Sequence, residues 1–230
     1  MDKAQILFIF ICLFWSCKQS DSTKVDMPKE DIHVKTEIVK EPIKPRFKAP
    51  DGWQEITNDT PGFVTDIKYA TTDNFVSEVM YECGKCFLRN EAAESLFSVA
   101  SELKKKNLRI KLLDCYRPAP VQQRLWDKVP NASYVTPPWR GSQHNRGVAI
   151  DLTIVDANDK ELDMGTSFDY FGEEAHHTYT GHSEEIQQNR TLLKTLMEHF
   201  GFASIRTEWW HYSIAKLKHL DVSEWEWECE

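Results

Sequence analysis

The stretch Ser142–Asp151, SQHNRGVAID, is the part of the chain from which the fold can first be inferred. Its last residues open a longer run, Val148–Val155, that is mostly β-branched or otherwise apolar, as is typical of a buried strand. Gly147 offers a bend immediately before this run. We therefore expect His144 to lie on a loop that enters the strand and Asp151 to lie within it.

A second segment, Glu208–His211 (EWWH), supplies another imidazole and another carboxylate. Two imidazoles and one carboxylate suit a zinc ion, and three protein ligands leave a fourth position open for water, as hydrolysis requires. Each of these residues alone would more often be structural. Because Glu208 and His211 are three apart in an expected strand, their side chains would point to opposite faces. A bulge or a strand start must intervene if both reach one metal.

Both segments resemble the signature of the D-alanyl-D-alanine dipeptidase family, which includes the dipeptidase of vancomycin resistance. That signature is Ser-x-His-x-x-Gly-x-Ala-x-Asp, followed far downstream by Glu-x-Trp-His. Its fixed positions are all met, by Ser142, His144, Gly147, Ala149, Asp151, Glu208, Trp210 and His211. Three further segments resemble family motifs: Lys68–Phe75, Asp114–Pro118 and Met164–Asp169. The resemblance spans about Phe63 to Ser213.

The resemblance implies that one zinc ion per chain is bound by His144, Asp151 and His211. It implies that Glu208 is the catalytic base and later the proton donor, and that Arg117 steadies the tetrahedral intermediate. These residue types suit such chemistry. A carboxylate can take a proton from the attacking water and return it to the leaving amine, and a guanidinium keeps its charge at all relevant pH values.

The resemblance also implies a binding site for a small dipeptide. Asp169 would hold the free ammonium of the substrate, and Tyr69 and Ser142 would line the site. Cys115 stands where the family has glycine, so the turn before Arg117 is expected to differ slightly if that glycine serves a positive φ.

We therefore expect zinc-dependent hydrolysis of D-alanyl-D-alanine or similar dipeptides from peptidoglycan metabolism. One alternative is a zinc D,D-carboxypeptidase or endopeptidase that acts on peptidoglycan stem peptides. Another is a catalytically silent, zinc-stabilised binding module. Glu208 and Arg117 argue against the silent module, because only catalysis calls for them. Asp169 is the residue that discriminates a dipeptidase from a carboxypeptidase.

The N-terminus is expected to be a targeting segment. Lys3 precedes the apolar run Ile6–Trp15, which is too short to span a bilayer but suits a signal-peptide core. We predict a signal peptide over 1–16, a lipidated Cys17, and a flexible tether over 17–48 that is rich in charge and proline. The alternative is ordinary secretion with an unmodified Cys17. The expected location is the bacterial cell envelope, with the protein lipid-anchored to the membrane and facing the periplasm.

The remaining residues, 49–230, are long enough for one domain with a sizeable core, since 41% of the 230 residues are hydrophobic. The net charge of −8 argues against a nucleic-acid partner, whose phosphates require basic side chains. Strands and helices mixed without a βαβ rhythm predict the α+β class. The family resemblance implies a central, mainly antiparallel sheet flanked by helices. Helices are predicted over 90–106, 118–126 and 183–200, with strands over 108–113, 148–155 and 208–214.

Four cysteines lie in the predicted domain: Cys83, Cys86, Cys115 and Cys229. The first two form a C-x-x-C pair, which could be a small disulfide in an oxidising periplasm. A zinc knuckle is disfavoured because no second C-x-x-C exists. A redox role for the pair has little support, because no thioredoxin-like pattern surrounds it.

Overall fold

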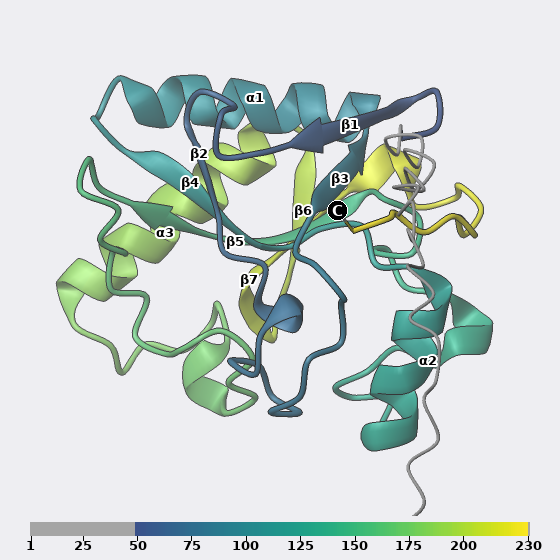
Figure 1. Ribbon diagram of the computed structural model, residues 1–230. Coiled ribbons are helices and arrows are strands. Elements are labelled where there is room, and N and C mark those ends of the chain that lie inside the picture. The colour runs from purple at the N-terminus through teal and green to yellow at the C-terminus, as the bar shows by residue number, and fades with distance from the viewer. Residues whose placement is uncertain (1–48, 230) are drawn as a thin grey trace, which may run out of the picture. The chain divides into compact units, whose positions relative to one another are not determined.

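The computed structural model describes residues 49–229, which contain three α-helices and seven strands (Figure 1). The expected α+β class is confirmed. The predicted signal peptide, the lipidation site at Cys17 and the tether lie outside the described residues. Within residues 49–229, the helices are too short or too polar for any of them to cross a membrane.

The main sheet has five strands in the order β2-β4-β5-β7-β6. Only the pairing of β2 with β4 is parallel, and the other three pairings are antiparallel. The sheet is therefore mainly antiparallel, as expected. Its strands are β2 (Phe63–Thr65), β4 (Arg109–Asp114), β5 (Ala149–Val155), β6 (Phe202–Ile205) and β7 (Glu208–Ile214). A separate antiparallel pair joins β1 (Trp53–Ile56) to β3 (Cys86–Arg89).

The three predicted helices are present, with shifted ends. They are α1 (Asn90–Lys104), α2 (Ala119–Lys128) and α3 (Glu184–His199). Ser183 caps α3 by accepting a hydrogen bond from the Ile186 amide at 3.3 Å. Asn90 is the first residue of α1 rather than its cap. α1 packs against β4 and α3 against β6 and β7, whereas α2 lies on the other side of the sheet from α1 (Figure 1).

β5 lies at the centre of the sheet, and all seven of its residues are buried. Its alternate residues point to opposite faces. Ile150, Leu152 and Ile154 enter the apolar core, which the inward-facing residues of α1 and α3 complete. Asp151 points to the opposite face. A charged residue thus sits in a fully buried strand, where its desolvation must be offset by partners.

Two irregularities in the sheet aim polar side chains at the same face as Asp151. In β4, Leu112 pairs with Leu152 but Asp114 pairs with Asp151, so Leu113 is an extra residue that forms a bulge. In β7, Tyr212 pairs with Ser204, but Glu208 pairs with Ile205, the very next residue of β6. The ladder therefore skips three residues between Glu208 and Tyr212. The spacing of Glu208 and His211 called for a bulge or a strand start, and both are present, because Glu208 is also the first residue of β7.

Two disulfides join parts of the chain that are distant in sequence. Cys83 is bonded to Cys229, and Cys86 to Cys115. The suggested disulfide within the C-x-x-C pair is therefore wrong. Cys86 is the first residue of β3 and faces the turn that follows β4, whereas Cys83 precedes the strand and meets the C-terminal tail. Cys115 is not among the described residues with positive φ, so it needs no glycine-like backbone.

Candidate active site

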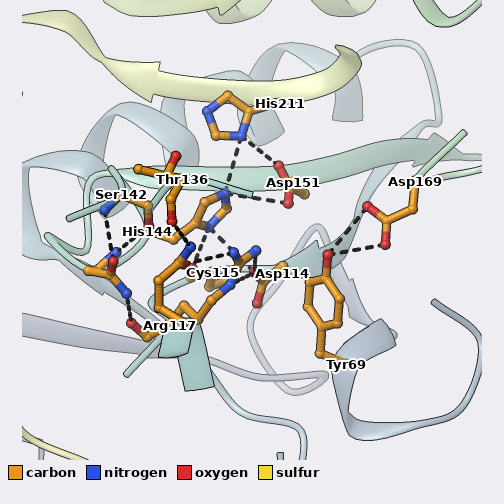
Figure 2. Close-up of polar contacts among 12 residues, drawn as sticks. Tyr69, Asp114, Cys115, Arg117, Thr136, Ser142, His144, Asp151, Asp169 and His211 are labelled. Carbon is orange, nitrogen blue, oxygen red and sulfur yellow. Dashed lines mark hydrogen bonds and ion pairs between the residues drawn. The ribbon is translucent and has the colours of Figure 1, made fainter. Parts of the chain in front are cut away.

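Three side chains from separate segments meet above the centre of the sheet (Figure 2). Asp151 on β5 and His211 on β7 are direct cross-strand partners, so their side chains share one face. His144 reaches the same place from the loop before β5. His144 Nε2 lies 3.1 Å from His211 Nδ1 and 3.4 Å from an Asp151 carboxylate oxygen, and His211 Nδ1 lies 2.9 Å from the other. Among the described residues, these three form the one group that could hold a metal ion, and they are called the metal-ligating cluster below.

A contact at Nδ1, the ring nitrogen that does not face the other two residues, fixes the orientation of His144. Its Nδ1 lies 2.7 Å from the carbonyl oxygen of Cys115, which can only accept a hydrogen bond. The proton therefore belongs on Nδ1, and Nε2 presents a lone pair to the other two groups. The disulfide from Cys86 holds Cys115 in place, so a covalent link from β3 supports the orientation of this imidazole.

Glu208 stands at the start of β7 beside this cluster. Its side chain is half-buried, and its carboxylate has no hydrogen-bond partner in residues 49–229. Burial, and then the nearby charge of Asp151, raise the pKa of Glu208 above its usual value, although His211 opposes the shift. A carboxylate of raised pKa next to a metal site is suited to accept and return a proton.

Arg117 is buried and held from three sides. Its Nε and Nη2 donate hydrogen bonds to one carboxylate oxygen of Asp114, at 3.1 and 2.6 Å, and its Nη1 donates to Gln122 Oε1 at 3.0 Å. Its guanidinium carbon lies 4.9 Å from the centre of the Tyr69 ring. The other oxygen of Asp114 accepts a hydrogen bond from Tyr81 at 2.7 Å. The guanidinium is therefore fixed in position before any ligand binds.

Asp169 and Tyr69 form a second polar group, to one side of the metal-ligating cluster (Figure 2). The Tyr69 hydroxyl donates to the Asp169 carboxylate at 3.1 Å. Burial, and then the charge of Asp151, raise the pKa of Asp169 well above its usual value. Asp169 also adopts a left-handed backbone with φ of 58°, which is uncommon outside glycine. A half-buried carboxylate with this uncommon backbone conformation, on the wall of a site, is a candidate functional residue.

A cavity of about 250 Å³ connects these groups. It is lined by all three residues of the metal-ligating cluster and by Arg117, Glu208, Asp169, Tyr69 and Ser142, together with apolar and aromatic side chains. This volume is below the range of about 300–1,000 Å³ typical of drug-sized ligands, so the cavity suits a small molecule. A larger cavity of about 560 Å³ adjoins it at Phe75 and Asp169 but contains no metal-ligating side chain.

The family model for D-Ala-D-Ala dipeptidases of the M15 peptidases matches residues 52–221. The chain belongs to this family. The D-alanyl-D-alanine dipeptidase of Escherichia coli K12 is 36% identical over 154 residues, which cover 67% of this chain and 80% of that protein. The corresponding protein of Enterococcus faecalis V583 is 32% identical over 178 residues, covering 68% and 88%.

Among solved structures, a vancomycin-resistance D,D-pentapeptidase in complex with Zn(II) overlaps 58% of this chain and 75% of its own, with 14% identity and a TM-score of 0.39. A TM-score below 0.5 is too low to establish a shared fold. Membership of the dipeptidase family therefore stands on the sequence matches.

Every site residue that the family signature predicted lies on the same cavity, although their roles stay predictions. Ser142 differs from expectation in one respect. Its hydroxyl oxygen accepts a hydrogen bond from the Asn145 amide at 3.1 Å, and its own amide donates to the Asn145 side chain at 2.8 Å. Ser142 therefore also shapes the loop that carries His144.

Three buried polar residues of this site were not singled out from the sequence. Asp114 and Gln122 hold Arg117, and Asn145 donates to the Arg117 carbonyl oxygen at 2.6 Å. Asp114 and Asn145 lie inside family motifs, which was a usable signal. Gln122 lies outside them, on a helix with many polar residues, and nothing in the sequence distinguishes it from Gln123 next to it.

Proposed function

We propose that this chain is a zinc-dependent dipeptidase that hydrolyses D-alanyl-D-alanine or similar dipeptides from peptidoglycan metabolism. The observation that carries the proposal is one small cavity lined both by the three residues of the metal-ligating cluster and by the half-buried carboxylate of Asp169. The metal-ligating cluster supports hydrolysis, and the Asp169 carboxylate supports recognition of a free ammonium. The curated relatives in the dipeptidase family are consistent with this substrate.

The residues present fit zinc. Two imidazole nitrogens and a carboxylate form a ligand set typical of catalytic zinc, with about 2.0–2.2 Å expected between metal and ligand. One ligand atom from each of the three residues lies within 4.8 Å of the other two, so the three side chains can converge on one ion. When bound, zinc would polarise the substrate carbonyl and make hydroxide available near neutral pH.

The protein's own residues would perform the remaining steps. Glu208 would accept the proton of the attacking water and deliver it to the leaving amine, as a carboxylate positioned beside the metal ligands can do. Arg117 would oppose the negative charge that develops on the carbonyl oxygen, and its fixed position avoids reorganisation at that moment. Asp169, oriented by Tyr69, would hold the substrate ammonium and so place the peptide bond beside the metal.

The metal assignment predicts the behaviour of His211→Ala. Removal of one of three ligands should abolish stoichiometric zinc, because two protein ligands rarely retain the ion. Elemental analysis of the purified variant after dialysis measures this directly. His199→Ala, at the end of α3 and outside the cluster, is the matched control and should keep one zinc per chain. Full zinc content in the His211 variant would contradict the assignment.

The role of Arg117 predicts that Arg117→Lys is not a conservative change. A lysine ammonium can pair with Asp114, but it cannot also reproduce the planar fork that contacts Gln122. The loss should fall mainly on kcat, because the contact strengthens in the transition state. Steady-state kinetics with the free dipeptide measure it. Equal kinetics for the two proteins would assign Arg117 a structural role.

The proposed function is tested by incubating residues 49–230 with zinc and a panel of substrates. We expect turnover of free D-alanyl-D-alanine and little turnover of acetylated dipeptides or pentapeptide stems. Equal cleavage of the stems would favour the D,D-carboxypeptidase or endopeptidase. Stoichiometric zinc without turnover of any peptide would favour the silent binding module.

We further propose that the protein is lipid-anchored in a bacterial cell envelope through Cys17 and faces the periplasm. The support is the charged start and apolar run that precede Cys17. The two disulfides are also consistent with an oxidising compartment. Cys17→Ser should move the protein from the membrane fraction to the soluble fraction of cells. Retention in the membrane fraction would contradict the anchor.

A further inference from the structure

We propose that Gln122 is a positioning residue for Arg117: its side-chain amide turns the guanidinium so that two N–H groups face the catalytic cavity. This inference rests on the proposed function, because it assigns Arg117 to the developing charge of the reaction. It concerns a residue outside the family motifs, on the first turns of α2.

Gln122 is held at both ends of its amide. Only 1% of the residue is exposed, which is unusual for a glutamine. Its Oε1 accepts a hydrogen bond from Arg117 Nη1 at 3.0 Å, and its Nε2 donates to the Thr136 carbonyl oxygen at 2.7 Å. A buried amide with both ends paired is rigid, and either contact would be costly to leave unmade.

The amide can adopt only one orientation here. An arginine has donors and no acceptor, so Nη1 must meet the oxygen of Gln122. A backbone carbonyl has no donor, so Thr136 must meet the nitrogen. Each contact therefore permits only the amide orientation that the other also requires. The position of the Thr136 carbonyl in turn sets the position of Gln122 Oε1, the acceptor for Arg117.

The N–H groups of Arg117 are divided between its two hydrogen-bond partners and the cavity. A guanidinium carries five N–H groups. Two of them are used by Asp114, through Nε and Nη2, and a third is used by Gln122, through Nη1. One N–H remains on each of the two terminal nitrogens. Arg117 lines the catalytic cavity, so this pair is available to an oxygen atom of a bound ligand.

A neutral acceptor is chemically preferable to a second carboxylate at this position. Asp114 already places one negative charge against the guanidinium, at 2.6 Å from Nη2. A glutamate at position 122 would add another and weaken the ability of Arg117 to oppose charge on the substrate. Gln122 instead fixes the orientation of the guanidinium without neutralising it.

The same amide ties Arg117 to a wall of the cavity. Thr136 belongs to a loop whose residues Tyr134, Val135 and Thr136 all line the cavity. Tyr134 stacks on Phe171, with ring centroids 4.6 Å apart, and both residues line the cavity. The position of this wall is therefore transmitted through Gln122 to the guanidinium.

The test compares Gln122→Met with Gln123→Met in the zinc-loaded protein. Methionine keeps the length and flexibility of glutamine but makes neither hydrogen bond. Gln123 is exposed and bonds only to Asp127 on its own helix, so its variant is the matched control. For Gln122→Met we expect kcat for free D-alanyl-D-alanine to fall by roughly 10–100-fold, with KM and zinc content within about twofold. Unchanged kcat would overturn the inference.

A double-mutant cycle separates positioning from general stability. If Gln122 acts through Arg117, Gln122→Met should have little further effect on kcat when Arg117 is already lysine. A residue that merely stabilises the fold would reduce activity by the same factor in both backgrounds. Additive effects would therefore overturn the inference, even if the single variant were slow.

A spectroscopic measurement decides the matter independently of turnover. In ¹⁵N-labelled protein with zinc added, the Nη groups of Arg117 should give separate, slowly exchanging resonances, assigned by their loss in Arg117→Lys. Gln122→Met should average them, and Gln123→Met should not. If the unaltered protein cleaved no dipeptide, the proposed function would fail, while these spectra would still show whether Gln122 holds Arg117. Unchanged spectra for Gln122→Met would overturn the inference.

Discussion

Glu208→Gln is expected to lower kcat for D-alanyl-D-alanine by roughly 10²–10⁴-fold, the usual scale for loss of a general base. The amide has nearly the shape of the carboxylate but cannot accept the proton of water. The carboxylate of Glu208 makes no hydrogen bond within residues 49–229, so the change breaks no structural contact there. The expected loss is therefore confined to the chemical step.

The zinc content of this variant is the decisive companion measurement. The metal-ligating cluster consists of His144, Asp151 and His211, and it does not include Glu208. Zinc should therefore remain at one ion per chain. Glu94→Gln on the exposed face of α1 is the matched control and should be fully active. If Glu208→Gln lost its zinc, Glu208 would be a ligand, and the mechanism would need to be redrawn.

The second large effect is expected when the amino group of the substrate is blocked. N-acetylation of D-alanyl-D-alanine should reduce kcat/KM by at least about a hundredfold. The acetylated form cannot pair with Asp169, and breaking a buried charge pair costs about 3–5 kcal/mol, with tenfold for each 1.4 kcal/mol.

Asp169→Asn tests whether that carboxylate is responsible. Asparagine tolerates the left-handed backbone at this position, so the change removes charge without adding strain. The variant should cleave the free dipeptide more slowly and show a narrower difference between the free and acetylated forms. Asp51→Asn, on the exposed start of the domain, should leave the difference as it is. If Asp169→Asn still cleaved the free dipeptide at least about a hundredfold better than the acetylated one, another residue would recognise the ammonium.

The sequence predicted the parts of the fold that local patterns specify. The amphipathic helices α1 and α3 and the apolar strand β5 were found because their periodicity or composition is distinct. The short strands β1, β2, β3 and β6 were missed. Each has only three or four residues, and each depends on a partner strand rather than on a pattern of its own.

The residues of the site were predicted from the family signature, whereas the contacts that hold those residues in place were not predicted. The need for a bulge or a strand start between Glu208 and His211 followed from strand geometry, but the bulge at Leu113 could not be foreseen. The disulfide partners were likewise beyond reach, because four cysteines allow three pairings and spacing does not choose among them. Gln122 became visible only when the tertiary structure brought Arg117 and Thr136 to the two ends of its amide.

The pattern of disulfides has a consequence for the order in which the chain must mature. Cys83 and Cys86 are close neighbours, whereas Cys229 is synthesised 146 residues after Cys83. An oxidase that joins cysteines as they emerge would pair Cys83 with Cys86. The bond between Cys83 and Cys229 would then require thiol–disulfide exchange once Cys229 has been synthesised. Production of this enzyme with native pairing should therefore depend on a disulfide isomerase and on the presence of Cys229.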